Sequence, residues 1–138
     1  MKWTSKICYL NGRAAPSTFF TSNIPTHLCT HINYAFAFVK PDGTGLKTHE
    51  WNDITLYKEI MALKSANPKL KVYLSVGGWT HGTWGFSIAA RDDTSRRVFA
   101  TNALSFIQTH KFDGIDIDWE YPGYEGHPFH PGVKSLGL

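Results

Sequence analysis

The sequence predicts an α/β fold in which strands alternate with helices and run parallel. Three observations favour this fold: short apolar runs recur along the chain, segments with helical periodicity separate them, and Gly, Pro or Asn marks the junctions. Strands that are joined through helices are parallel, because each crossover brings the chain back to the same end of the sheet. In such folds ligands bind at the carboxyl ends of the strands, so a functional site is expected there.

Four segments are predicted to be strands because they are short, apolar and rich in β-branched or aromatic residues. They are residues 7–10, 31–39, 70–76 and 112–119. The second, HINYAFAFV, is the most apolar and ends before Pro41-Asp42-Gly43. Phe36 and Phe38 lie near its carboxyl end, and Gly77-Gly78-Trp79 follows the third strand, so both ends are expected at one common opening.

Helices are predicted between these strands. One begins at Asn52 and continues to about residue 66, where Asn67-Pro68 ends it. Its apolar stripe is Leu56, Ile60 and Leu63. Another is predicted to be capped by Thr94 or Ser95. Its buried stripe is Phe99, Ala103, Phe106 and Ile107. Residues 16–23 are predicted to form only a weak helix or turn.

Length and composition exclude several classes of protein. A chain of 138 residues, 42% hydrophobic, forms one globular domain at most. The net charge of +3 is small and scattered, so no nucleic-acid partner is expected. No run of 18 apolar residues is present, so no membrane span is expected. The amino terminus lacks the apolar stretch of a secretory signal.

The two cysteines, Cys8 and Cys29, leave two alternatives open. Two cysteines do not define a disulfide framework, and both can be buried thiols. However, Cys8 lies in the first predicted strand and Cys29 just before the second. If these strands are neighbours, the two residues can be bridged, which implies an oxidising compartment.

The run Asp113-Gly-Ile-Asp116-Ile-Asp118-Trp-Glu120 carries the strongest chemical signal. Side chains of a strand alternate between its faces, so Asp116, Asp118 and Glu120 share one face at intervals of about 6.6 Å. The other face, formed by Ile115, Ile117 and Trp119, is predicted to be buried. Crowded carboxylates raise the pKa of at least one member, which favours a role in general acid catalysis.

Two other interpretations of this run fit its residues less well. An antiparallel strand with one face in water also alternates, but such a face usually mixes Lys, Thr and Ser with its acids. A calcium loop requires Gly at its sixth position and Glu at its twelfth, where this chain has Tyr121 and His127. The pair His127 and His130 lies in a segment interrupted by Pro and is predicted to be loop. No metal and no cofactor are therefore expected.

These residues resemble glycoside hydrolase family 18 chitinases of the animal type. The pattern Asp-x-x-Asp-x-Asp-x-Glu is complete at Asp113, Asp116, Asp118 and Glu120, and Ser-x-Gly-Gly stands at residues 75–78. Similar stretches are CY (8–9), INYAFA (32–37), EWND (50–53) and DWEYPG (118–123). Endo-acting glucosaminidases share the acidic pattern, but the EWND and WEYP stretches are more similar to chitinases.

The resemblance implies a (β/α)8 TIM barrel that hydrolyses chitin or chito-oligosaccharides with retention. It implies that Glu120 is the general acid, that Asp118 orients the substrate's acetamide, that Asp116 shares a proton with Asp118, and that Asp113 supports this network. It also places further residues in the sugar-binding cleft. These are Tyr9, Phe36, Glu50, Trp51, Gly77, Gly78, Trp79, Thr80 and Tyr121. A secreted location is implied as well.

The chain contains strands one to four of such a barrel, so residues 1–123 are expected to be the amino-terminal half of the catalytic domain and residues 124–138 an irregular tail. Three functions remain open. In the first, the chain is part of an active chitinase and is inactive as a half-barrel fragment. In the second, it is a lectin-like protein that binds chito-oligosaccharides without turnover. In the third, it is a non-catalytic half-barrel that pairs with a complementing half-barrel.

Overall fold

The computed structural model describes residues 5–12 and 21–123. The expected tail, 124–138, and most of the weak segment at 16–23 lie outside the described residues. The strands are β1 Ile7–Asn11, β2 His31–Val39, β3 Leu46–Lys47, β4 Lys71–Gly77 and β5 Gly114–Asp118. The α-helices are α1 Asp53–Ala62, α2 Trp84–Ala90 and α3 Asp93–His110. The 3-10 turns are η1 Thr21–Asn23, η2 Leu63–Ser65 and η3 Trp79–His81.

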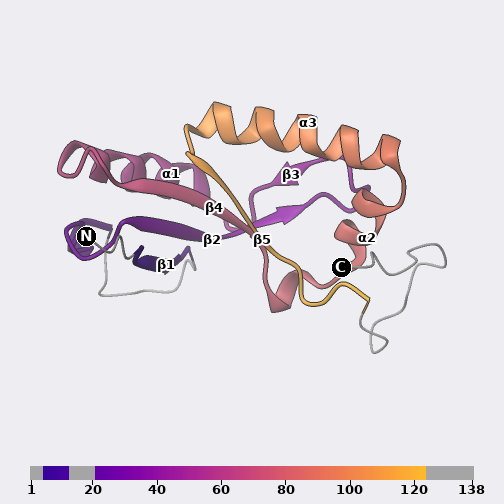
Figure 1. Cartoon of the computed structure of the whole chain (residues 1–138), viewed down its shortest axis with the longest axis horizontal. Helices are drawn as coiled ribbons and strands as arrows, with labels where there is room; N and C mark the ends of the chain where they lie inside the picture. Colours follow the sequence, from indigo (N-terminus) through magenta and orange to yellow (C-terminus); the bar gives the residue numbers. More distant parts are fainter. Residues whose placement is uncertain (1–4, 13–20, 124–138) are drawn as a thin grey trace.

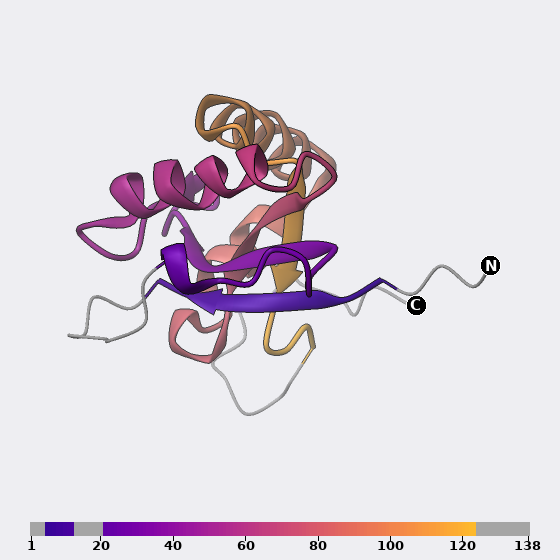
Figure 2. The ribbon, with the colours of Figure 1, turned by 90° about the vertical axis from the view of Figure 1, so that its left-hand side faces the viewer.

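The four predicted strands form one parallel sheet in the order β1-β2-β4-β5. The two-residue strand β3 pairs with the end of β2 in the antiparallel direction. Helices α1 and α3 lie side by side on one face of this sheet (Figures 1 and 2). The opposite face is therefore free to carry the polar side chains that point away from the helices.

The hydrophobic core lies between the sheet and the two long helices. Ile32, Val72 and Leu74 from the central strands are 1% exposed or less, as is Ile60 of α1. The ring of Tyr57 on α1 packs edge-on against Tyr34 of β2, with ring centroids 4.9 Å apart. Each such side chain contributes about 1.5–3 kcal/mol by leaving water. The sheet and the helices therefore hold each other in place.

A disulfide joins Cys8 of β1 to Cys29, just before β2. The two strands are neighbours, so the condition for a bridge between these cysteines is met. The crosslink closes a loop with a sequence separation of 21 residues. In the chain-entropy account such a loop is worth about 3 kcal/mol of stability. It ties the outer strand β1 to the rest of the sheet.

The prediction for the strands is confirmed with small shifts at the ends, and the exact span 31–39 is found for β2. The helix predicted for residues 52–66 is α1 followed by η2. Two short elements, β3 and α2, were missed because they are too short to show a periodic pattern. Among the described residues, no helix has the length and apolar character needed to cross a bilayer.

The predicted cap of the last helix was wrong. Helix α3 begins at Asp93, and Asp92 is its N-cap, because the carboxylate of Asp92 accepts a hydrogen bond from the Ser95 amide over 2.7 Å. That backbone hydrogen bond, together with Arg91 and the Ser95 side chain, lowers the pKa of Asp92 to about 2. A carboxylate accepts from a helix amide better than a hydroxyl does, and it also interacts with the helix dipole.

The prediction that Ile117 is buried was also wrong. Ile117 is 48% exposed, whereas Ile115 and Trp119 pack against the core cluster. The cause is the position of its strand, because β5 is an outer strand of the described sheet. Alternation along a strand fixes which face a residue occupies, but burial of that face depends on what packs against it.

Candidate active site

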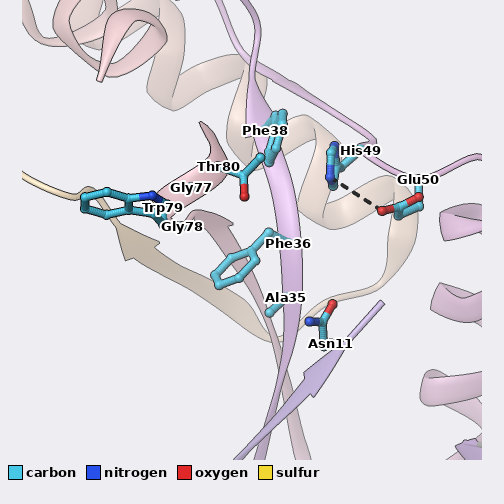
Figure 3. Close-up of a pocket in the computed structure, with 10 residues that line it drawn as sticks. All are labelled: Asn11, Ala35, Phe36, Phe38, His49, Glu50, Gly77, Gly78, Trp79 and Thr80. Carbon is cyan, nitrogen blue, oxygen red and sulfur yellow. Dashed lines mark ion pairs between the residues drawn. The ribbon is translucent and has the colours of Figure 1, made fainter. Parts of the chain in front are cut away.

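Two adjoining hollows open where the carboxyl ends of the parallel strands meet. One has a volume of about 430 Å³ and contains two of the predicted acids. Its lining residues are Tyr9, Asn11, Ala35, Phe36, Asp116, Ile117 and Asp118. The other has a volume of about 230 Å³ (Figure 3). Its lining residues are Asn11, Ala35, Phe36, Phe38, His49, Glu50, Gly77, Gly78, Trp79 and Thr80. The shared residues at 11, 35 and 36 make the two hollows parts of one cleft.

Asp116 is held by hydrogen bonds from three other strands. Its Oδ2 accepts from the Ser75 hydroxyl at 2.7 Å, the Asn33 amide nitrogen at 3.0 Å and the Tyr9 hydroxyl at 3.1 Å. Ser75 lies on β4, Asn33 on β2 and Tyr9 on β1. Because all three donors converge on one oxygen, the orientation of this carboxylate is fixed by the sheet itself.

Asp118 has a pKa that its surroundings raise. Partial burial raises the pKa of its carboxyl, and the negative charges of Glu120 and then Asp116 raise it further. The crowding that the sequence predicts is therefore present, and it favours the protonated form of Asp118. Glu120 lies two residues beyond the end of β5, is partly buried and does not line either of the two hollows. The peptide bonds Glu120–Tyr121 and Ala35–Phe36, at this end of the sheet, are cis.

Asp113 lies at the opposite end of β5 from this cleft. Its carboxylate forms ion pairs with Lys64 at 2.7 Å and Lys71 at 3.4 Å, and it accepts from the Val72 amide at 2.9 Å. Burial alone would raise its pKa, but the Lys64 hydrogen bond, the Val72 amide and the two lysine charges outweigh it and lower the pKa. These contacts fasten the start of β5 to β4 and η2. Asp113 can therefore influence Asp116 and Asp118 only by fixing the position of the strand that carries them.

The glycines after β4 allow a close contact with the acidic strand. Gly77 has φ +114°, and a Cβ there would overlap the carbonyl oxygen of Asp118. Gly78 has φ +79°, and its amide donates to the same oxygen over 2.9 Å. L-residues with side chains rarely adopt these conformations. The Gly77-Gly78 turn therefore brings Trp79 and Thr80 to the cleft beside Asp118.

A buried carboxylate holds the other wall of the cleft. Asp53 is 1% exposed and accepts from the amides of His49 at 2.7 Å and Glu50 at 2.9 Å, and from the Tyr34 hydroxyl at 2.5 Å. Glu50 in turn forms an ion pair with His49 over 3.5 Å. The ring of His49 stacks on Phe38 with centroids 3.9 Å apart (Figure 3). The backbone of Glu50 is therefore held by Asp53, and its side chain is held at the cleft by His49.

The predicted cleft residues divide into two groups. Most of them line one hollow or the other, namely Tyr9, Phe36, Glu50, Gly77, Gly78, Trp79 and Thr80. Trp51 is 87% exposed and Tyr121 is 52% exposed, and neither lines these two hollows, so their roles stay predictions. In the described part of the chain, no group of three or more His, Cys, Asp or Glu side chains is placed to bind a metal.

Several residues of the site were missed from the sequence. Asn33 and Ser75 hold Asp116, and Asn11 and His49 line the cleft. Asn33 stands as a polar residue inside an apolar strand, and this was a usable signal, because a buried polar side chain needs a hydrogen-bonding partner. Ser75 was visible as the first residue of Ser-x-Gly-Gly. His49 carries no signal, because its position depends on the fold of a loop.

Comparison with known proteins agrees with this geometry. Residues 3–134 match the glycosyl hydrolases family 18. The chain belongs to this family. The mouse (Mus musculus) protein chitotriosidase-1 is 44% identical over 126 residues, which cover 88% of this chain and 27% of the mouse protein. This family 18 chain thus spans about a quarter of the length of that relative, and its lineage is that of a glycosidase.

Solved structures place the sheet within the family's fold. An immunomodulatory active chitinase from Trichuris suis superimposes with a TM-score of 0.80 and 41% identity, over 86% of this chain and 33% of that one. Human YKL-39, a pseudo-chitinase with retained chitooligosaccharide binding, gives a TM-score of 0.74 and 35% identity, over 86% of this chain and 33% of its own. The parallel strands of this family 18 chain are therefore part of a (β/α)8 barrel.

Proposed function

We propose that this chain supplies the catalytic strand of an enzyme that hydrolyses the β-1,4 linkages between N-acetylglucosamine units of chitin. The observation that carries the proposal is the arrangement of the acidic strand: Asp116 is fixed by donors from three strands, and Asp118 beside it has a raised pKa. Glu120 stands two residues beyond Asp118, and its charge acts on the Asp118 carboxyl. The active chitinase from Trichuris suis supports the same class of reaction.

In the proposed mechanism, Glu120 is the general acid. It gives its proton to the glycosidic oxygen as the bond from that oxygen to the anomeric carbon breaks. The carbonyl oxygen of the substrate's own acetamide attacks that carbon, so that no protein nucleophile is required, as in the substrate-assisted exceptions among retaining glycosidases. Water then opens the cyclic intermediate, and Glu120 takes a proton from that water. The two displacements together retain the configuration.

Asp118 is proposed to orient the acetamide and to stabilise the positive charge that develops on its nitrogen. This role requires a carboxyl that can hold or share a proton close to Glu120, and the raised pKa of Asp118 is consistent with it. Asp116 would share a proton with Asp118 while its other contacts keep it in place. Asp113 is proposed to act at a distance, by fixing the start of the strand on which the acids stand.

The second candidate is binding of chito-oligosaccharides without turnover. It is favoured by the similarity to human YKL-39, a pseudo-chitinase that retains such binding. The presence of Glu120 favours hydrolysis in the whole protein, because it provides the proton donor that bond cleavage requires. For the 138-residue chain by itself we expect negligible turnover, unless a complementing half-barrel completes the cleft. A secreted location fits the Cys8–Cys29 disulfide, since disulfides persist in oxidising compartments.

The test is Glu120→Gln in the full-length protein that carries this segment, with a chromogenic chito-oligosaccharide as substrate. We expect the rate to fall by about 10²-fold or more, because the proton donor is lost, while calorimetric binding of the same sugar is retained. Glu59→Gln is the matched control, since it makes the same chemical change on the outer side of α1, where Glu59 accepts from the Thr21 hydroxyl. An unchanged rate in the Glu120 variant would remove Glu120 from the acid role.

A further inference from the structure

We propose that the end of the molecule opposite the cleft is a binding surface for a linear sulfated polysaccharide. Lysines at the amino ends of the parallel strands form this surface, and we call them the lysine pole. They are Lys6, Lys64, Lys69, Lys71 and Lys111. The inference does not rest on the proposed hydrolysis of chitin, because none of these lysines lines either hollow of the cleft.

The fold gathers these lysines, although they are scattered in the sequence. Lys6 directly precedes β1, Lys71 is the first residue of β4, and Lys69 lies two residues before it. Helices α1 and α3 run back toward the starts of the strands that follow them (Figure 1). Lys64 in η2 and Lys111 after α3 therefore arrive at the same end of the sheet as the other three.

Backbone hydrogen bonds make this surface continuous. The Thr30 amide donates to the Lys6 carbonyl at 2.9 Å, and the Lys71 amide donates to the Thr30 carbonyl at 3.1 Å. The carboxylate of Asp113 pairs with the ammonium groups of both Lys71 and Lys64. Neighbouring strands are about 4.8 Å apart, which is less than the Debye length of about 8 Å at physiological salt. The charges of the pole therefore act together on a ligand.

The positive charge of the pole exceeds what its surroundings neutralise. Asp113 compensates one of the two lysines with which it pairs. Lys6, Lys69 and Lys111 are exposed and form no ion pair with a described residue. The carboxyl ends of the two helices contribute about half a negative charge each. Of the five lysine charges, about three therefore remain to attract an anion.

Several acids lie at the other end of the molecule. Asp53, Asp92 and Asp93 stand at the beginnings of α1 and α3, which is the cleft end of each helix. Asp116 and Asp118 line the larger hollow. A polyanion is therefore attracted to the pole and repelled from the cleft. Binding at the pole would hold the molecule with its cleft open to another ligand.

The chemistry of the pole favours an extended polyanion over a single small anion. Lysine carries a compact charge on a flexible stem, whereas bidentate recognition of one phosphate or carboxylate uses the planar fork of arginine. The arginines of the described residues, Arg91, Arg96 and Arg97, lie at or just before the start of α3, at the cleft end. The Cys8–Cys29 disulfide indicates an oxidising compartment, where sulfated polysaccharides and not nucleic acids are the abundant linear polyanions.

An anionic membrane is the competing partner. Helices and segments that lie on a bilayer place Trp, Phe or Leu into it beside their basic residues. The exposed tryptophans of the described residues are Trp51 near the start of α1, Trp79 in η3 and Trp84 at the start of α2. These elements lie toward the cleft, so the aromatic anchors and the lysines are at opposite ends. This separation favours the polysaccharide.

The test measures binding of a heparin-derived decasaccharide to the full-length protein that carries this segment, by calorimetry at several salt concentrations. The pole variant combines Lys6→Gln, Lys69→Gln and Lys111→Gln. We expect its affinity to fall by about tenfold or more. The slope of log K against log salt should also fall by about 2, since each contact with a flexible polyanion contributes about 0.7. A change in slope reports lost charge contacts and not a change in folding.

The matched control combines Lys40→Gln, Lys47→Gln and Arg97→Gln. It removes the same charge from exposed residues at the cleft end. We expect its affinity to stay within about twofold of the wild type, because these charges lie more than a Debye length from the pole. Equal losses in the two variants would show that only net charge matters and would overturn the proposal. So would undiminished binding by the pole variant, or no binding by the wild type at physiological salt.

Three further measurements complete the test. If the pole variant fails to fold, Lys69→Gln alone should still weaken binding, because only the amide of Lys69 has a recorded hydrogen bond, to Asn67. Binding to phosphatidylserine vesicles but not to the decasaccharide would assign the pole to membranes and contradict the proposal. Displacement of the decasaccharide by tetra-N-acetylchitotetraose would place it in the cleft, with the same consequence. Absence of chitin hydrolysis in the wild type would overturn the proposed function alone.

Discussion

Ser75 donates its hydroxyl hydrogen to Oδ2 of Asp116 over 2.7 Å, although 41 residues separate the two in the sequence. The contact follows from the pairing of β4 with β5, in which Ser75 and Asp116 are direct partners. Ser75 is fully buried, so its hydroxyl has no competing contact with water. The bond is charge-assisted, which makes it one of the stronger contacts at the site.

Ser75→Ala is expected to lower kcat of the full-length protein by about tenfold while KM changes less. Losing a hydrogen bond to a charged group costs about 1.5–3 kcal/mol, and part of this loss would appear as a less ordered Asp116. Steady-state kinetics on a chito-oligosaccharide measures the effect. Ser105→Ala, at an exposed serine of α3, is the control and should leave kcat unchanged. Equal kcat values for Ser75→Ala and the wild type would contradict a role for this hydrogen bond.

Asp118→Asn is expected to stabilise the fold at neutral pH. The folded-state pKa of Asp118 is raised, so its contribution to stability is fully present below its ordinary pKa and is lost as the pH rises through the folded-state value. Above that value the wild type retains an unfavourable carboxylate that the neutral amide lacks. Thermal unfolding should therefore show a higher midpoint for the variant at pH 7, and this advantage should shrink below pH 4. A pH-independent difference would exclude this origin.

Asp113→Ala is expected to destabilise the chain by about 1–3 kcal/mol, because it leaves the Val72 amide without its acceptor and removes both lysine pairs. Asp113→Asn should cost less, since an amide oxygen can still accept from Val72. Urea unfolding of the two variants separates the hydrogen bond from the charge. If the two variants lose equal stability, the lysine pairs and not the backbone contact account for the effect.

Thr83→Val is expected to disturb the acidic strand by removing the hydrogen-bond acceptor of the Trp119 indole. The indole nitrogen of Trp119 donates to the Thr83 hydroxyl over 2.7 Å, and its ring stacks on Phe86 with centroids 5.3 Å apart. Trp119 stands between Asp118 and Glu120, so its anchoring helps to set the direction in which those carboxyls point. Valine should cost about 1 kcal/mol of stability and lower kcat in the full-length protein. Thr83→Ser keeps the acceptor and should restore both.

Local patterns were sufficient for most of the fold. The strand at 31–39 was predicted with its exact limits because its apolar run ends at Pro41, and the stripe of the first helix was visible at Leu56 and Ile60. The short helix α2 and the strand β3 were missed because they are too short for their pattern to repeat clearly. The cap of α3 was placed on Thr94 or Ser95, although Asp92 was the better acceptor.

Alternation along the strand placed Asp116 and Asp118 on one face, because backbone geometry turns successive side chains to opposite sides wherever the strand lies. Which donors meet Asp116 was decided by the tertiary structure. Tyr9, Asn33 and Ser75 reach one oxygen only because β1, β2, β4 and β5 stand in that order and register. Strand order results from packing over the whole sheet, and no short stretch of sequence carries it.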